Sequence, residues 1–156
     1  QSWSVVRVRR ELPKRRFASP VAENSEPPNG GSHLMAYDDQ NIFAKILRKE
    51  IPCSKVYEDE HTFAFKDINP KAPVHLLVIT KGPYVSLDDF SATASDAEQA
   101  AFCRAIGRVA RDAGLAEGGY RVMANIGAHG RQEVQHLHLH ILGGHDIGPM
   151  VTRLKN

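Results

Sequence analysis

The chain has 156 residues, of which 42% are hydrophobic and 24% charged, a composition typical of one soluble globular domain. The net charge of +2 is unevenly placed: residues 1–34 carry six Lys or Arg against three Glu, and the remainder is close to neutral. These values exclude a disordered chain, they do not indicate a nucleic-acid-binding protein, and no apolar run approaches the roughly 18 residues of a membrane span.

Residues 1–34 differ in composition from the rest. The stretch "VVRVRRELPKRR" is basic, and "ASPVAENSEPPNGGS" is rich in Pro, Gly, Ser and Glu. We expect a non-domain leader at 1–34, a linker or expression remnant, ahead of one domain at 35–156. An Arg-rich targeting peptide and a basic binding arm remain alternatives. If the leader is ordered, its alternating "SVVRVRR" is expected to add a strand to a sheet edge.

The first regular elements follow at residue 41. The stretch "NIFAKILRKE" (41–50) places its apolar residues on one helical face, with Asp38 or Asp39 expected as the cap. Next, "SKVYEDEHTFAFKDI" (54–68) predicts a hairpin, and "VHLLVIT" (74–80) predicts a buried strand.

The second half of the domain repeats this helix-then-strands order. The stretch "SDAE" (95–98) matches a capping box and opens a helix that Gly114 ends. Two strands are then predicted, "YRVMANIG" (120–127) and "VQHLHLHIL" (134–142). The order predicts an α+β domain, with an antiparallel sheet of about five strands and two main helices.

The last predicted strand carries three histidines at alternate positions. Residues two apart in a strand share a face, so His136, His138 and His140 are expected to project together. The outer two lie about 13 Å apart along the strand, so one metal ion with bonds of about 2 Å can bind two of them but hardly all three. A metal site would need further ligands, for which the candidates are His75, His129, Glu133 and His145.

Separate roles for the three rings give a better account than a shared metal. A neutral imidazole attacks phosphorus only if its other nitrogen holds the proton, and a backbone carbonyl that accepts this N–H fixes the tautomer. The stretch "NIGAHGRQEV" (125–134) places Gly127 and Gly130 just upstream, where loop amides can hold phosphate oxygens. Glycine there also suits a plain hairpin turn.

The motif "HLHLHIL" resembles the signature of the histidine triad (HIT) superfamily. The stretches "IFAKILRKEIP", "FAFKDINPKAPVHLLVITK" and "GYRVMANIGAHGRQEVQHLHLHILGG" look like its Hint branch, the nucleoside phosphoramidases, and the similarity covers residues 39–150. The resemblance implies a homodimeric α+β fold, no cofactor and no metal. It also implies hydrolysis of purine nucleotide conjugates of AMP or GMP in the cytoplasm, without nucleic-acid or membrane partners. Two free cysteines, without a C-x-x-C pair, fit a reducing compartment.

The resemblance also assigns residues. It makes His138 the nucleophile, places His140 at the phosphate and the bridging atom, and completes a four-histidine cluster with His136 and His75. Asp67 matches the carboxylate that binds ribose. The base pocket is matched by Ile42, Phe43, Ile46, Phe65 and Ile68, and the phosphate site by Asn125, Gln132, Glu133 and Val134. Without the resemblance, Ile42, Phe43 and Ile46 are better explained as core and His75 as a buried core histidine, and Asp67 is also explained as a turn cap.

Several departures from the family pattern bear on function. Asn41 and Ala44 stand where some relatives carry a zinc-binding cysteine pair, so a structural zinc is not expected. Glu133 suggests a bacterial source, and Arg131 and Gln135 replace residues beside the phosphate. Because the third histidine is retained, hydrolysis is favoured over nucleotidyl transfer. A dinucleoside polyphosphate hydrolase, a nucleotide-binding scaffold and a metal hydrolase remain as alternatives.

Overall fold

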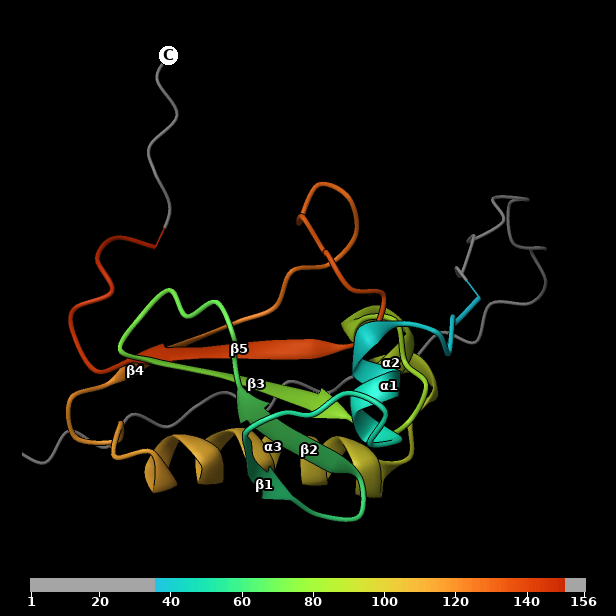
Figure 1. Cartoon of the computed structure of the whole chain (residues 1–156), viewed down its shortest axis with the longest axis horizontal. Coiled ribbons are helices and arrows are strands. Elements are labelled where there is room, and N and C mark those ends of the chain that lie inside the picture. The colour runs from blue at the N-terminus through green and yellow to red at the C-terminus, as the bar shows by residue number, and fades with distance from the viewer. Residues whose placement is uncertain (1–35, 151–156) are drawn as a thin grey trace, which may run out of the picture. The chain divides into compact units, whose positions relative to one another are not determined.

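The computed structural model describes residues 36–150, which form an α+β unit (Figure 1). Its elements in chain order are α1 (Ile42–Leu47), β1 (Lys55–Glu58), β2 (Thr62–Lys66), β3 (Val74–Thr80), α2 (Leu87–Thr93), α3 (Asp96–Asp112), β4 (Tyr120–Met123) and β5 (His138–Gly143). The strands make one antiparallel sheet in the order β1-β2-β3-β5-β4. The predicted fold class and the sheet of five strands are therefore confirmed.

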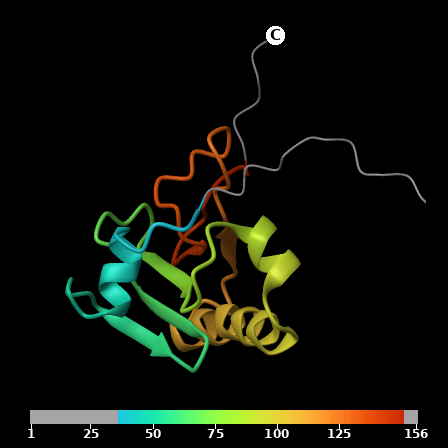
Figure 2. The ribbon, with the colours of Figure 1, turned by 90° about the vertical axis from the view of Figure 1, so that its right-hand side faces the viewer.

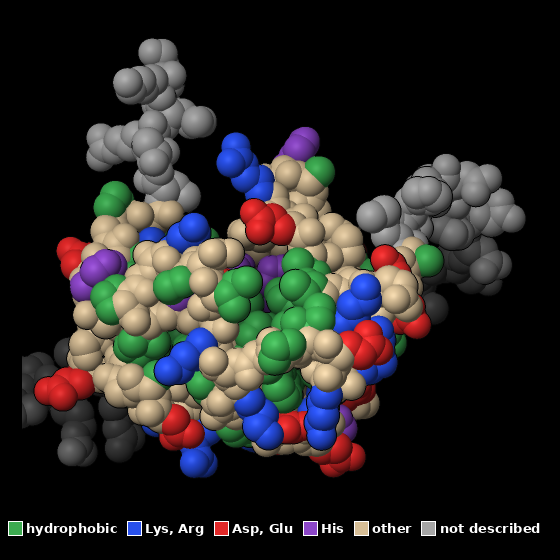
Figure 3. All heavy atoms as spheres, viewed as in Figure 1, with side chains coloured by type: hydrophobic (Ala, Val, Ile, Leu, Met, Phe, Trp, Pro, Cys, Tyr) green, Lys and Arg blue, Asp and Glu red, His purple; other side chains and the backbone are tan. Residues whose placement is uncertain are grey.

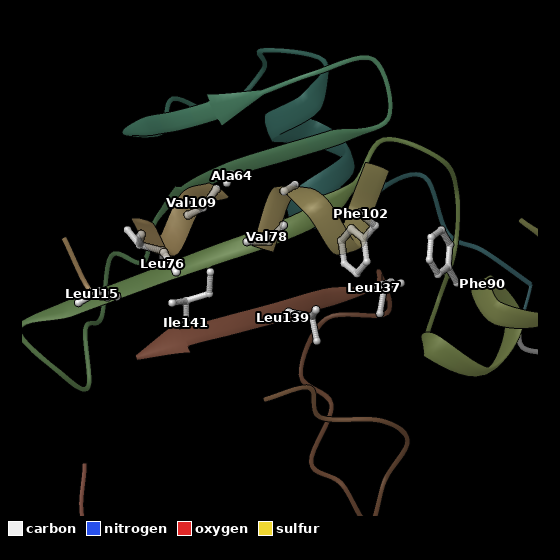
Figure 4. Packing of buried hydrophobic residues seen from close by; sticks show 12 residues of the cluster. Ala64, Leu76, Val78, Phe90, Phe102, Val109, Leu115, Leu137, Leu139 and Ile141 are labelled. Atoms are coloured by element: carbon white, nitrogen blue, oxygen red, sulfur yellow. The ribbon is translucent and has the colours of Figure 1, made fainter. Parts of the chain in front are cut away.

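Helices cover the sheet from both sides (Figure 2). On one face, α2 and α3 pack over the alternate apolar residues of β2, β3 and β5, as Figure 4 shows for Val78, Phe102 and Ile141. On the other face, Phe43 and Ile46 of α1 pack against residues of β2 and β3. Both faces of β3 are thus buried, which explains the apolar run "LLVI" within its sequence "VHLLVIT".

Helix α1 begins with a different cap from the one predicted. The side chain of Asn41 accepts hydrogen bonds from the backbone N–H groups of Phe43 and Ala44, both at 2.9 Å. The prediction of Asp38 or Asp39 as the cap was wrong. The side chain of Asp38 accepts from the N–H of Gln40, which lies before the first residue of α1. The role belongs to Asn41 because its side chain reaches the second and third amides of the helix.

The other two helices each begin with a capping box. The predicted box of Ser95 and Glu98 is confirmed at the start of α3. Helix α2 was not predicted, although Ser86 and Asp89 form the same reciprocal pair. Asp in place of Glu at the third helical position, and a helix of only 7 residues, give a weak sequence signal.

The hairpin and the strand at 74–80 are confirmed, whereas both late strands are shorter than predicted. Strand β4 ends at Met123, and β5 begins only at His138. The prediction of strand over 134–137 was wrong because these amides bond outside the sheet. The N–H of His136 donates to the carbonyl of Val134, and that of Leu137 donates to the carbonyl of Tyr84.

Some predictions concern residues beyond the described range. The leader at 1–34 and its proposed edge strand lie outside residues 36–150, so the division into leader and domain stays a prediction. Within the described range, no helix has the length and apolarity needed to cross a membrane. Cys53 and Cys103 are free thiols, and a cytoplasmic location stays a prediction.

Candidate active site

Three imidazoles gather on the face of the sheet that carries α1. His138 and His140 lie two residues apart on β5, and the antiparallel register places His75 of β3 diagonally across from His140. The ring centroids of His138 and His140 are 5.2 Å apart, and so are those of His75 and His140. The rings therefore form a row with His140 in the middle.

The backbone holds His138 in one tautomer. Its Nδ1 lies 2.7 Å from the carbonyl oxygen of His136, and because a carbonyl only accepts, Nδ1 carries the proton. In the neutral ring, Nε2 then bears the free lone pair. Burial lowers the pKa of His138 below its usual value, against the opposing effects of the carbonyl and of nearby carboxylates. His138 thus offers a neutral imidazole with an unprotonated Nε2, the state that nucleophilic attack requires.

A chain of hydrogen bonds sets the tautomers of the other two rings. The backbone N–H of Lys71 donates to Nδ1 of His75 at 3.1 Å, so the neutral ring of His75 carries its proton on Nε2. That nitrogen lies 2.9 Å from Nδ1 of His140 and donates to it. The neutral ring of His140 consequently carries its proton on Nε2. Burial, followed by the neighbouring histidines, lowers the pKa of His140 to about 4.

His136 lies before β5 and has a different environment. Its ring is fully buried, with Nε2 at 2.8 Å from the carbonyl oxygen of Thr80 and Nδ1 at 2.6 Å from the hydroxyl of Tyr37. Burial lowers its pKa to about 4. Phe43 of α1 packs edge-on against both His136 and His138. His136 therefore supports His138 through its backbone carbonyl, while its own ring is not part of the lining of the cleft described below.

The histidine row lines a cleft of about 510 Å³. Figure 3 shows histidine side chains in this hollow, between hydrophobic residues and an acidic rim. Lys71 supplies a positive charge to the lining, and Asp67 and Glu133 supply negative ones. The full lining comprises Phe43, Asp67, Asn69, Lys71, His75, Leu77, Met123, Asn125, Glu133, Val134, His138, His140 and Leu142.

The loop between β4 and β5 forms one wall of the cleft. Gly127 has a φ of 64°, and a Cβ on Gly130 would lie 2.3 Å from the carbonyl oxygen of Ile126, so the loop needs glycine at both places. Gln132 fastens the loop: its side chain accepts from the N–H of Gly127 and donates to the carbonyl of Val85. The glycine spacing noted in the sequence is therefore a requirement of this wall.

One group of side chains has donor atoms spaced for a cation. Atoms of Asp67, His75 and His140 lie within 4.8 Å of one another, and within residues 36–150 this is the one such group. The carboxylate of Asp67 is 3.4 Å from Nε2 of His75. A cation that bound Nε2 of His75 and Nδ1 of His140 would have to replace the proton of their hydrogen bond.

The structure brings together only part of the predicted site set. Eight of the predicted residues line the cleft, namely Phe43, Asp67, His75, Asn125, Glu133, Val134, His138 and His140. Ile46 of α1 and Phe65 of β2 are buried in the core between that helix and the sheet. Ile68 is 83% exposed, and Ile42 faces a neighbouring hollow. Gln132 braces the loop, and His136 lies behind His138.

Sequence reasoning missed other residues of the site. Asn69, Lys71, Leu77, Met123 and Leu142 line the cleft, and Tyr37, outside the lining, is hydrogen-bonded to His136. Leu77 and Leu142 share the histidine face by strand alternation, so the register gives a signal for them. Lys71 and Tyr37 lie on irregular segments, where no periodicity marks them.

With this geometry established, comparisons with known proteins are informative. The family model described as "HIT domain" matches residues 48–147. A HIT-like protein of Azospirillum brasilense, itself uncharacterized, is 59% identical over 75% of this chain and 96% of its own length. A purine nucleoside phosphoramidase of Escherichia coli (strain K12) is 42% identical over 73% of this chain and 95% of its own. Among solved structures, a HIT family hydrolase from Clostridium thermocellum has a TM-score of 0.67 at 42% identity, covering 73% of this chain and 98% of that one.

Proposed function

Because the chain belongs to the HIT domain family, we propose that it hydrolyses nucleoside 5'-phosphoramidates, releasing a nucleoside monophosphate and an amine. The observation that carries this proposal is the hydrogen bond from Nδ1–H of His138 to the carbonyl of His136, which leaves Nε2 as a nucleophile at the cleft. A relative named purine nucleoside phosphoramidase supports the substrate class and a purine base.

The first proposed step is attack by Nε2 of His138 on the α-phosphorus. The P–N bond of the substrate breaks, and its electron pair leaves with the amine, which needs a proton. His140 is placed to supply it: an anionic phosphoryl group beside this ring favours the protonated form, and the proton on Nε2 passes to the departing nitrogen. The product is a nucleotidyl-histidine on His138 with His140 neutral again.

The second step is hydrolysis of that intermediate. A water oxygen attacks phosphorus while His140 takes its proton, and the bond between phosphorus and Nε2 of His138 breaks with its electron pair returning to the ring. One water is consumed overall, and the enzyme returns to its starting state. In the neutral ring of His140, Nδ1 accepts a hydrogen bond from His75, so Nε2 is the nitrogen that exchanges protons with the reacting groups.

The remaining predicted residues are proposed to hold the nucleotide. Asp67 is proposed to accept from the ribose hydroxyls and Phe43 to contact the base, while Asn125 and the loop amides contact the phosphate. Lys71, which sequence reasoning missed, adds a positive charge to the same cleft and so favours an anionic substrate. No cofactor or metal is part of this scheme.

We also propose that two copies pair through β4. This strand bonds to β5 on one side and is an edge of the sheet formed by residues 36–150, with Tyr120, Val122 and Met123 each about 40% exposed. Light scattering in solution tests this: Val122→Lys is expected to shift a dimer towards monomer. A monomeric wild-type chain would exclude the pairing.

A substrate comparison tests the proposed activity. The purified protein is expected to release amine from an adenosine or guanosine phosphoramidate and to cleave a diadenosine polyphosphate more slowly. Faster cleavage of the polyphosphate would favour the alternative hydrolase, and binding of nucleotide without a burst of amine would favour a scaffold. If the activity is lost on chelation and restored by a metal ion, a metal-dependent mechanism must replace the proposed one.

A further inference from the structure

Tyr37, just before α1, makes a contact that the proposed mechanism does not use. Its hydroxyl oxygen lies 2.6 Å from Nδ1 of His136, and the two rings meet edge-on with centroids 5.5 Å apart. His136 is 0% exposed, so bulk water does not compete with this hydroxyl for Nδ1. Tyr37 also precedes the stretch 48–147 that matches the HIT domain model.

The direction of this hydrogen bond follows from the other side of the ring. Nε2 of His136 lies 2.8 Å from the carbonyl oxygen of Thr80, which can only accept, so Nε2 carries the proton. In the neutral ring, Nδ1 must then accept, and the hydroxyl of Tyr37 donates to it. The opposite tautomer would set the lone pair of Nε2 against the Thr80 oxygen at the same distance, and the burial of the ring makes that costly.

The same residue supplies the carbonyl that orients the nucleophile. His136 O accepts the Nδ1–H of His138 at 2.7 Å, so any shift of the His136 peptide moves the imidazole that is proposed to attack. Thr80 and Tyr37 hold the His136 ring from its two nitrogens, and Phe43 packs edge-on against it at 6.0 Å. The hydroxyl of Tyr37 is thus one end of a hydrogen-bonded path that reaches the nucleophile.

We infer that Tyr37 is a positioning residue: its hydroxyl holds His136 in the Nε2–H tautomer and so holds the carbonyl that aims His138. The effect on catalysis rests on the proposed function, whereas the tautomer is a property of the free protein. Loss of the hydroxyl leaves Nδ1 of a buried imidazole without its donor, and both the other tautomer and the protonated ring become more populated.

The variant Tyr37→Phe tests the inference because it keeps the aromatic ring and removes only the hydroxyl. Tyr57→Phe is the matched control, since Tyr57 is also partly buried and donates one hydrogen bond, to Asp59 at 2.8 Å, away from the cleft. With a nucleoside phosphoramidate, we expect Tyr37→Phe to lower kcat by about fivefold to tenfold with KM little changed.

The tautomer is measured separately, by nitrogen-15 NMR of the histidine side chains in the free protein. The wild type is expected to show His136 protonated at Nε2, and Tyr37→Phe to show this form less populated. A wild-type His136 protonated at Nδ1 would overturn the inference whether or not the variant folds, and so would a Tyr37→Phe enzyme that behaves like Tyr57→Phe. If the wild type cleaves no phosphoramidate, the proposed function fails, while the NMR result still decides the role of Tyr37.

Discussion

Each imidazole near the cleft has a neighbour that can only donate or only accept. The carbonyl of His136 fixes the tautomer of His138, and the amide of Lys71 fixes that of His75. His75 in turn fixes the tautomer of His140. A neutral nucleophile and a proton carrier therefore lie side by side before any substrate binds. Burial lowers the pKa of each ring, so the rings are neutral in the free protein and do not themselves attract the phosphate by charge.

A pH profile of kcat/KM checks these protonation states. The pKa of His138 is lowered from 6.5, so the neutral form persists below that pH, and those of His136 and His140 are about 4. Activity requires neutral His138 and is lost as the ring gains a proton. Because the departing amine also needs a proton from His140, we expect a bell-shaped profile: an acidic limb below 6.5, where His138 gains a proton, and a fall towards alkaline pH, where His140 is no longer protonated. An acidic limb centred above 6.5 would contradict the account.

The choice of His138 as the attacking ring came from the family resemblance and stays a prediction. The repeat of histidines was enough to predict that a backbone carbonyl would set the tautomer of such a ring. It was not enough to find Lys71 or Tyr37, because each reaches its histidine from a segment without periodic pattern, and only the fold brings them together. Ile46 and Phe65, assigned to the base pocket by resemblance, lie in the core, since an apolar residue near a site has the same sequence signal as one beneath it.

Helix α1 illustrates how a short element depends on its cap. Six residues are too few for a helix to be stable alone, so its cap and the packing of Phe43 keep it in place. The longer helix α3 was predicted from its capping box and apolar periodicity, whereas α2 and the correct cap of α1 were not. Helix α2 has one buried residue, Phe90, so no apolar periodicity marks it in the sequence.

Removing the α1 cap should affect both stability and substrate binding. Asn41→Ala is expected to lower the free energy of unfolding by about 1 kcal/mol and to raise KM, because α1 carries Phe43 of the cleft. Ser95→Ala removes a comparable cap from α3, on the opposite face, and serves as the control. Urea unfolding and steady-state kinetics measure the two effects. An unchanged KM in Asn41→Ala would show that α1 does not contribute to substrate binding.

The wall between β4 and β5 offers a second test at this scale. A Cβ at Gly130 would lie 2.3 Å from the oxygen and 2.7 Å from the nitrogen of Ile126, so Gly130→Ala must displace the loop that carries Asn125 and Glu133. We expect kcat/KM to fall by about tenfold or more. Gly118→Ala is the control, because a Cβ there meets nothing within 4 Å. Equal activity in both variants would show that the wall does not position substrate.

Across the whole described domain, the two faces of the sheet have separate tasks. The face under α2 and α3 holds the larger apolar core, and the face under α1 holds the histidines and the cleft. Alternation along β3 and β5 links them, because each strand contributes one side chain to stability and the next to the site. The fold class was predictable from this alternation, whereas how the ends of the strands turn away from the sheet was not.

The buried histidines should make the stability of the whole protein depend on pH. The pKa values of His136 and His140 are about 4 in the folded state against 6.5 for the free side chain, so the unfolded chain binds more protons between those values. Stability is therefore fully present above 6.5 and is lost as pH falls towards 4. Urea unfolding from neutral to acidic pH should show this loss, and His140→Gln should reduce it. A stability that rises with acidification would contradict the burial of neutral rings.

The central claim is that His138 forms a covalent bond to the α-phosphorus of a nucleotide. Reaction with a nucleoside phosphoramidate, quenched within the first turnover and mapped by mass spectrometry, tests it most directly. The account predicts a nucleotidyl group on His138, and in His138→Ala it predicts turnover reduced by about 10⁴-fold with nucleotide still bound. His145→Ala, which changes an exposed histidine outside the cleft, is expected to retain both the adduct and activity. A nucleotidyl group on another residue, or normal turnover by His138→Ala, would contradict the account.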